Sequence, residues 1–71
     1  MKVQIDREAD ALYIRLREGA IVESEEVRPG LVLDFDGNGE IVGIEVLDAS
    51  RHMNPEELAS VTVQNLTAAQ A

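Results

Sequence analysis

The side chains best suited to chemistry in this sequence are the oxygen donors between positions 34 and 45. Asp34, Asp36, Asn38 and Glu45 follow the spacing of a calcium-binding EF-hand loop, with Gly39 at its required place. The flanking segments alternate like strands rather than helices, so we expect a β-hairpin. Its second strand, at about 3.3 Å per residue, would carry Glu45 away from the tip. Asp34, Asp36 and Asn38 remain weak candidates for binding a divalent cation or small ligand.

Two other constellations could support catalysis. Asp34 and Asp36 lie two positions apart, a spacing that suits paired carboxylates in hydrolysis, but a small sheet offers no evident cleft to raise one pKa. The residue types of a catalytic triad occur at Asp48, Ser50 and His52. Their side chains are not expected to meet at one point, because all three lie in one short connection. We therefore expect no catalytic residue, no cofactor and no metal centre.

The composition narrows the classes of partner. The 71 residues carry a net charge of −8, with no cysteine, one histidine and two aromatic residues. A phosphate backbone needs a basic surface and bases need aromatic platforms, so direct nucleic-acid binding is not expected. No apolar run approaches the ~18 residues of a membrane span, and the first ten residues lack an apolar signal core. We expect a cytoplasmic protein that does not engage a membrane.

The elements that must position these side chains are mostly strands. Residues 2–5 and 12–16 alternate and predict a first hairpin, in which Tyr13, Arg15 and Arg17 share one face and pair with acids. Residues 31–36 and 40–47 predict a second hairpin with a type I′ turn at Asn38-Gly39. That turn pairs the apolar residues of one face, Phe35 with Val42, Leu33 with Ile44 and Leu31 with Val46.

The remaining segments complete the prediction. Residues 21–27 are rich in acids and suit an edge strand, followed by a type II turn at Pro29-Gly30. Asn54 can cap a short helix and complete a capping box with Glu57. Residues 61–64 alternate and could add one further short strand. Gly43, in mid-strand, indicates a bulge or a close backbone approach.

These elements predict an α+β fold that is mostly β: an antiparallel β-meander of four or five strands with a short C-terminal helix. Residues 1–64 form a single β-rich domain in this interpretation, and residues 65–71 form a frayed tail. One sheet cannot bury its own apolar face, and a helix around Leu58 would cover only part of it. We therefore expect a homodimer, in which the two copies could exchange their C-terminal segments.

Four segments resemble the domain-of-unknown-function family numbered 2283. They occur in the family's order, within about residues 5 to 53: Asp10-Ala11-Leu12-Tyr13-Ile14-Arg15-Leu16, Pro29-Gly30, Leu33-Asp34-Phe35-Asp36, and Val42-Gly43-Ile44-Glu45-Val46-Leu47 with Asp48-Ala49-Ser50. The resemblance implies a small β-rich domain with a short C-terminal helix. It implies no enzyme activity and transfers no functional residue. Members that look like partners of small toxin-like proteins suggest an antitoxin-like role.

Together these features favour a small, non-catalytic, acidic protein-interaction module, with an antitoxin-like role as one form of it. A net charge of −8 suits association with a basic protein partner. The alternative is a divalent-cation or small-ligand-binding domain that uses the acids of residues 34–38.

Overall fold

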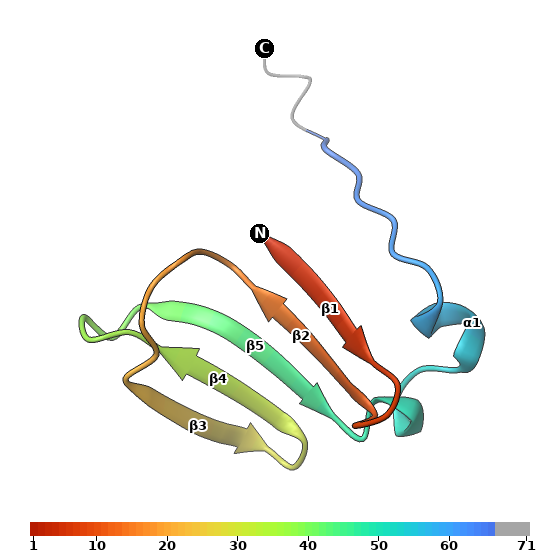
Figure 1. Ribbon diagram of the computed structural model, residues 1–71, viewed down its shortest axis with the longest axis horizontal. Helices are drawn as coiled ribbons and strands as arrows, with labels where there is room; N and C mark the ends of the chain where they lie inside the picture. Colours follow the sequence, from red (N-terminus) through yellow and green to blue (C-terminus); the bar gives the residue numbers. More distant parts are fainter. Residues whose placement is uncertain (67–71) are drawn as a thin grey trace.

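The computed structural model describes residues 1–66 as one antiparallel sheet with short helical segments after it (Figure 1). The strands are β1 (Lys2–Asp6), β2 (Ala11–Arg15), β3 (Glu23–Arg28), β4 (Leu31–Phe35) and β5 (Ile41–Leu47). A 3-10 turn, η1 (Ala49–Arg51), and the one-turn helix α1 (Pro55–Leu58) follow. The predicted fold class is confirmed: the chain is mostly β, with five antiparallel strands and a short helix.

The strand order is β1-β2-β5-β4-β3, so the sheet is not a simple meander. A hairpin of β1 and β2 joins a meander of β3, β4 and β5 through the pairing of β2 with β5. The chain between β2 and β3 therefore passes across the end of the sheet to its far edge (Figure 1). The acids of β3 explain its place, since a strand with exposed charges is tolerated at an edge and not at the centre.

The central hairpin has the predicted pairs Leu33 with Ile44 and Leu31 with Val46, but its tip is different. Gly39 has positive φ and Asn38 does not, so the predicted type I′ turn is wrong. The loop has three residues, 37–39, closed by the Gly39 amide donating to the Asp36 carbonyl at 3.0 Å. This loop shifts the register by one residue, and Phe35 pairs with Ile41 instead of Val42. A bulge beside Val42 reverses the shift and restores the predicted pairs below it.

The turns and caps follow local chemistry. Gly30 has φ of 85°, as the third position of the predicted type II turn requires. Asn54 and Glu57 form the predicted capping box at the start of α1. Residues 61–64 form no strand, and α1 lies beside the end of the sheet rather than across its face (Figure 1). The predicted frayed tail, 65–71, extends past the described residues, which end at 66.

The pairing register divides the sheet into two faces. The apolar face, as we define it, holds Val3, Ile5, Leu12, Ile14, Leu31, Leu33, Ile44 and Val46. The polar face holds Lys2, Gln4, Tyr13, Arg15, Ser24, Asp34, Glu45 and their neighbours. None of these eight residues is fully buried, whereas Val42, two residues before Ile44 on the same strand, is; among the described residues the buried hydrophobic side chains are Val42 and Ala49. Residues 1–66 therefore form one layer with a very small enclosed core.

No helix within residues 1–66 is long and apolar enough to cross a membrane.

Candidate functional site

A row of polar residues crosses the polar face at the level of Asp34. Ser24 on β3 lies opposite Asp34 on β4, which lies opposite Gly43 on β5. Gly43 in turn lies opposite Arg15 on β2. In the next row, Glu45 on β5 lies opposite Tyr13. Alternation along four strands thus gathers these side chains on one face, and we call Tyr13, Arg15, Ser24, Asp34 and Glu45 the Asp34 cluster.

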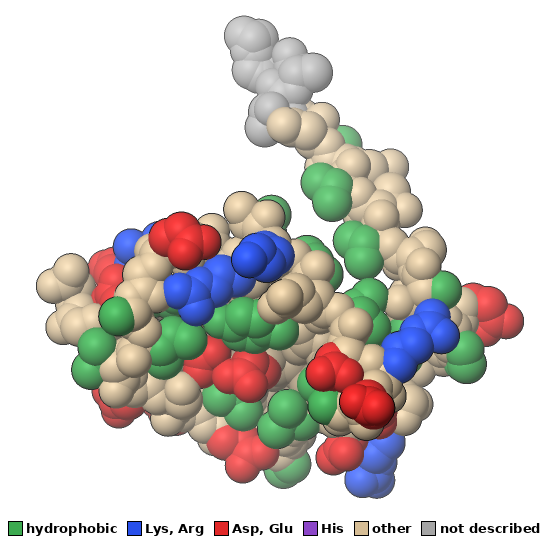
Figure 2. Space-filling view, in the orientation of Figure 1, with side chains coloured by type: hydrophobic (Ala, Val, Ile, Leu, Met, Phe, Trp, Pro, Cys, Tyr) green, Lys and Arg blue, Asp and Glu red, His purple; other side chains and the backbone are tan. Residues whose placement is uncertain are grey.

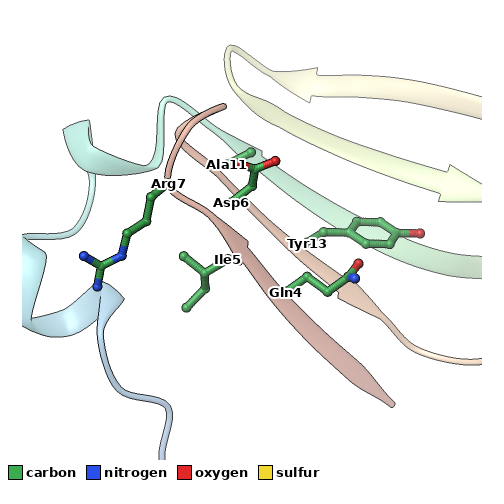
Figure 3. Close-up of a pocket in the computed structure, with 6 residues that line it drawn as sticks. All are labelled: Gln4, Ile5, Asp6, Arg7, Ala11 and Tyr13. Carbon is green, nitrogen blue, oxygen red and sulfur yellow. The ribbon is translucent and has the colours of Figure 1, made fainter.

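Gly43 is where the backbone of β5 comes closest to a side chain. A Cβ atom at this position would lie 2.5 Å from Tyr13 Oη and 2.8 Å from its Cε1. The ring of Tyr13 extends over β5 from its own strand (Figure 3). Arg15 fixes the far end of the ring, because its Nη1 donates to Tyr13 Oη at 3.3 Å. Both features predicted for Gly43 are present: a neighbouring bulge and a close approach.

Asp34 is the unusual member of the cluster, with only 1% of its surface exposed. Ser24 Oγ donates to Asp34 Oδ1 at 2.5 Å. Within residues 1–66, no donor reaches Asp34 Oδ2, which is itself buried. A buried carboxyl oxygen without a donor costs about 1–3 kcal/mol. The fold therefore retains an unfavourable group in a molecule with very little core.

Glu45 is the second carboxyl group of the cluster. Hydrogen bonding with Asp34 raises the pKa of Glu45, and partial burial and the negative charge of Asp34 raise it further. Two neighbouring carboxyl groups repel each other when both are ionised. The chemistry available here is proton binding by Glu45 beside Asp34.

Asp36 plays a different role from Asp34. Its Oδ1 accepts from the amides of Asn38 at 2.9 Å and Glu40 at 3.0 Å, and its Oδ2 pairs with Arg17 Nη2 at 2.5 Å. The hydrogen bond from the Glu40 amide lowers the pKa of Asp36 against a smaller effect of burial, and the Asn38 amide and Arg17 lower it further. This carboxylate holds the hairpin loop closed.

The three candidate ligands therefore do not converge at one point. Asp34 faces Ser24 and Glu45, while Asp36 and the Asn38 backbone build the loop. No group of three or more His, Asp or Glu side chains in the described part of the chain is placed to hold a metal ion. The extended β5 carries Glu45 away from the tip, as the hairpin prediction required.

The residues of the possible triad are separated as well. Ser50 Oγ donates to Asp10 Oδ2 at 2.7 Å, and the Ser50 amide donates to Asp10 Oδ1 at 2.9 Å. Asp48 adopts a left-handed conformation at the start of η1. His52 lines a shallow depression at the end of β5 instead. The two hydrogen bonds between Ser50 and Asp10 connect the segment after β5 to the turn of the first hairpin.

Shallow, open depressions lie on the described part of the surface. One lies beside the β1–β2 hairpin (Figure 3), lined by Gln4, Ile5, Asp6, Arg7, Ala11 and Tyr13. Another is lined by Glu26, Pro29, Gly30, Leu47, Asp48, Arg51 and His52. Neither encloses a nucleophile beside a base. The face turned to the viewer in Figure 2 carries acidic side chains over β3, β4 and β5, and basic ones over the end of β2.

The apolar face is the larger candidate site. It runs across four of the five strands, and α1 does not lie over it (Figure 1). Val3 at its margin is 38% exposed. Contiguous apolar surface of this kind on a soluble protein marks a surface that meets another molecule.

Sequence comparison finds a family and a relative, and it leaves the activity open. A family model described as a protein of unknown function, DUF2283, matches residues 2–50. An uncharacterised protein of Methanocaldococcus jannaschii is 37% identical over 57 residues, which cover 80% of this chain and 48% of that protein. The chain thus spans about half the length of that curated relative. No solved structure matches the chain.

Proposed function

This chain belongs to the DUF2283 family of proteins of unknown function, and we propose that it acts as a non-catalytic, acidic protein-interaction module. In this proposal, a second copy of the chain covers the apolar face. The resulting homodimer presents its acidic surface to a basic protein partner. The observation that carries the proposal is an apolar face without a second layer.

The size of the exposed surface supports a second copy as the occupant. The chain exposes 5430 Å² to solvent, whereas a compact monomer of 7.8 kDa exposes about 4,400 Å². Both the uncovered face and the extended residues after α1 contribute to the difference, with Val3 38% and Val63 77% exposed. That difference of roughly 1,000 Å² is close to the ~800 Å² that each partner contributes to a stable interface. A symmetric pairing of two such faces would supply the missing layer of the fold.

The distribution of charge supports a basic protein as the further partner. Three of the chain's 14 acids, Glu23, Glu25 and Glu26, lie exposed on the edge strand β3, where Glu23 and Glu25 stand opposite Phe35 and Leu33. Clustered surface charge speeds the encounter with an oppositely charged protein and makes the rate depend on salt. An antitoxin-like role, in which the acidic module binds a small basic toxin-like protein, is one form of this proposal.

Static light scattering at micromolar concentration tests the dimer directly. We expect a particle of twice the 7.8 kDa chain mass for the wild type. Ile14→Lys, in the middle of the apolar face, should convert it to a monomer, while Val22→Lys, at an exposed site outside that face, should leave it dimeric. Circular dichroism of each variant separates loss of association from loss of folding. A monodisperse wild-type monomer would overturn the proposal.

The basic partner calls for a second experiment. Affinity capture with the full chain, compared at low and high salt, should recover a basic protein whose yield falls with salt. Reversing the charges of Glu23, Glu25 and Glu26 to Lys should abolish that recovery. Partners that are insensitive to both changes would contradict the acidic docking surface.

The alternative function is binding of a divalent cation or small ligand by Asp34, Asp36 and Asn38. The oxygen donors at alternate positions 34, 36 and 38 of the hairpin are the observation in its favour. Titration with Ca²⁺ while amide resonances are followed distinguishes the two. Saturable shifts at residues 34–38 below millimolar Ca²⁺, and not with matched ionic strength, would favour the cation-binding alternative. We expect none, because the Asp36 carboxylate is already engaged by two amides and Arg17.

A further inference from the structure

The two edges of the sheet differ in their protection against pairing. At one edge, β3 carries three exposed glutamates, a device that discourages another strand from joining. At the other edge, β1 bears the sequence Lys2-Val3-Gln4-Ile5-Asp6 and, within residues 1–66, pairs with no strand other than β2. Its centre is uncharged, and no strand of the described residues occupies its outer side. The β1 edge is therefore the place where the sheet can grow.

The segment after α1 has the properties of a strand without a sheet. Residues 61–66 are uncharged, Val-Thr-Val-Gln-Asn-Leu, and begin with apolar and polar residues in alternation. Val61, Val63 and Leu66 are 56%, 77% and 80% exposed. The segment leads away from α1 without joining the sheet (Figure 1). β-Branched residues at alternate positions fit a pleated, half-buried surface, and this segment has none within its own chain.

The described part of the chain holds both an open sheet edge and a strand-like segment, residues 61–64, that lies outside the sheet. We propose that residues 61–64 of one copy pair with β1 of a second copy, so that each sheet gains a sixth strand from its partner. This inference rests on the proposed homodimer and names the segment that the two copies exchange. Reciprocal exchange of identical segments closes a two-fold dimer, since each copy both gives and receives one strand.

The exchange also adds to the apolar face. In a strand, Val61 and Val63 share one side, and Thr62 and Gln64 share the other. With the valines beside Val3 and Ile5 of the partner, the added strand widens the apolar face at its exposed margin. Thr62 and Gln64 then lie beside Gln4 on the polar face. The neutral segment meets a neutral strand centre, whereas β3 would offer it three carboxylates.

The absence of cysteine in the sequence makes a crosslinking test clean. Gln4→Cys is mixed and refolded with Thr62→Cys or with Gln64→Cys, and the mixture is oxidised. We expect a disulfide between the two different variants, detected as a product of twice the chain mass. Glu40→Cys, exposed at the remote hairpin tip, replaces the segment variant as the matched control and should give several-fold less product.

The double variant Gln4→Cys/Thr62→Cys tests pairing within one chain. At high dilution, a fast-forming internal disulfide, without product of twice the chain mass, would overturn the exchange. A second measurement does not depend on crosslinking geometry. Val63→Pro removes an amide and should weaken the dimer, so that light scattering finds monomer at concentrations where wild type is dimeric. Val63→Ile keeps the β-branched shape and should leave association unchanged.

The outcomes separate this inference from the proposed function. If wild type is a dimer, but Val63→Pro is equally dimeric and no mixed disulfide forms, the exchange is wrong and the face-to-face dimer stands. If wild type is a monomer, the proposed function fails first. A dimer that is weakened by Val63→Pro and captured by the mixed disulfide supports both.

Discussion

Replacing Asp34 with Asn should stabilise the protein at neutral pH, although it removes a native carboxylate. Asn has the same shape, and its Oδ1 can still accept from Ser24 Oγ, which donates at 2.5 Å in the wild type. Its amide group can donate toward Glu45, which a carboxylate cannot do. The substitution also removes the negative charge that helps to raise the pKa of Glu45.

The size of the expected stabilisation follows from the burial of Asp34. The residue is 1% exposed, and its Oδ2 has no donor within the described residues. Relieving one buried, unsatisfied polar atom is worth about 1–3 kcal/mol in the free energy of unfolding. In a domain of this size, each kcal/mol corresponds to a rise of about 4–8 °C in Tm. Urea denaturation followed by circular dichroism, at one fixed protein concentration, measures the difference.

The pH dependence of this gain gives the prediction a second test. The pKa of Glu45 lies above its ordinary value of 4.5 in the fold, so protonation of Glu45 favours folding. That stabilisation is complete below the ordinary pKa and is lost as the pH rises through the raised one. The advantage of Asp34→Asn should therefore be largest at neutral pH and shrink in acid. Destabilisation by Asp34→Asn at pH 7 would refute the account of a poorly satisfied carboxyl pair.

Three further predictions concern single contacts. Asp36→Asn, the same chemical change two residues away, should destabilise the protein at neutral pH. The pKa of Asp36 is lowered in the fold, so its carboxylate stabilises the fold above pH 3.8, and this stabilisation is lost as the pH falls through the lowered pKa. An acid unfolding titration of both proteins will detect the difference. Gly43→Ala should cost about 1–3 kcal/mol because its Cβ overlaps the Tyr13 ring, and a double-mutant cycle with Tyr13→Ala should recover part of that cost. Asn54→Ala removes the bond that the Asn54 side chain accepts from the Glu57 amide, while the backbone amide of residue 54 can still donate to Glu57, and should cost about 1 kcal/mol, with faster amide exchange confined to α1.

Much of the strand pairing in the central hairpin could be predicted, because it depends on residues that are close together in the sequence. The alternation of residues 31–36 and 40–47 fixed which faces meet, so the pairs Leu33–Ile44 and Leu31–Val46 were accessible from the sequence. The conformation of the hairpin tip could not be predicted in this way. Asn-Gly suits a type I′ turn, but the Asp36 side chain accepts hydrogen bonds from two amides of the loop and favours a three-residue loop. The compensating bulge beside Val42 is invisible to a pattern of alternation alone.

The candidate site could be predicted only in part, because some of its contacts join segments that are far apart in the sequence. Predicting Asp34 and Glu45 on one face required only the hairpin register, but the hydrogen bond from Ser24 to Asp34 joins β3 to β4. The ring of Tyr13 reaches Gly43 through the pairing of β2 with β5, a contact between segments about 30 residues apart in the chain. No local pattern indicates this pairing. The strand-like character of residues 61–64 was visible in the sequence, but a single chain provides no place for it.

The most direct test of the central claim is an isotope-filtered NMR experiment on a mixture of methyl-labelled and unlabelled chains. The account predicts contacts between the two copies at methyl groups of the apolar face, among them Leu12, Ile14 and Ile44. Val32 on the polar face should show none. A mixture without contacts between copies, or with contacts confined to the polar face, would contradict the claim that a second copy completes this sheet.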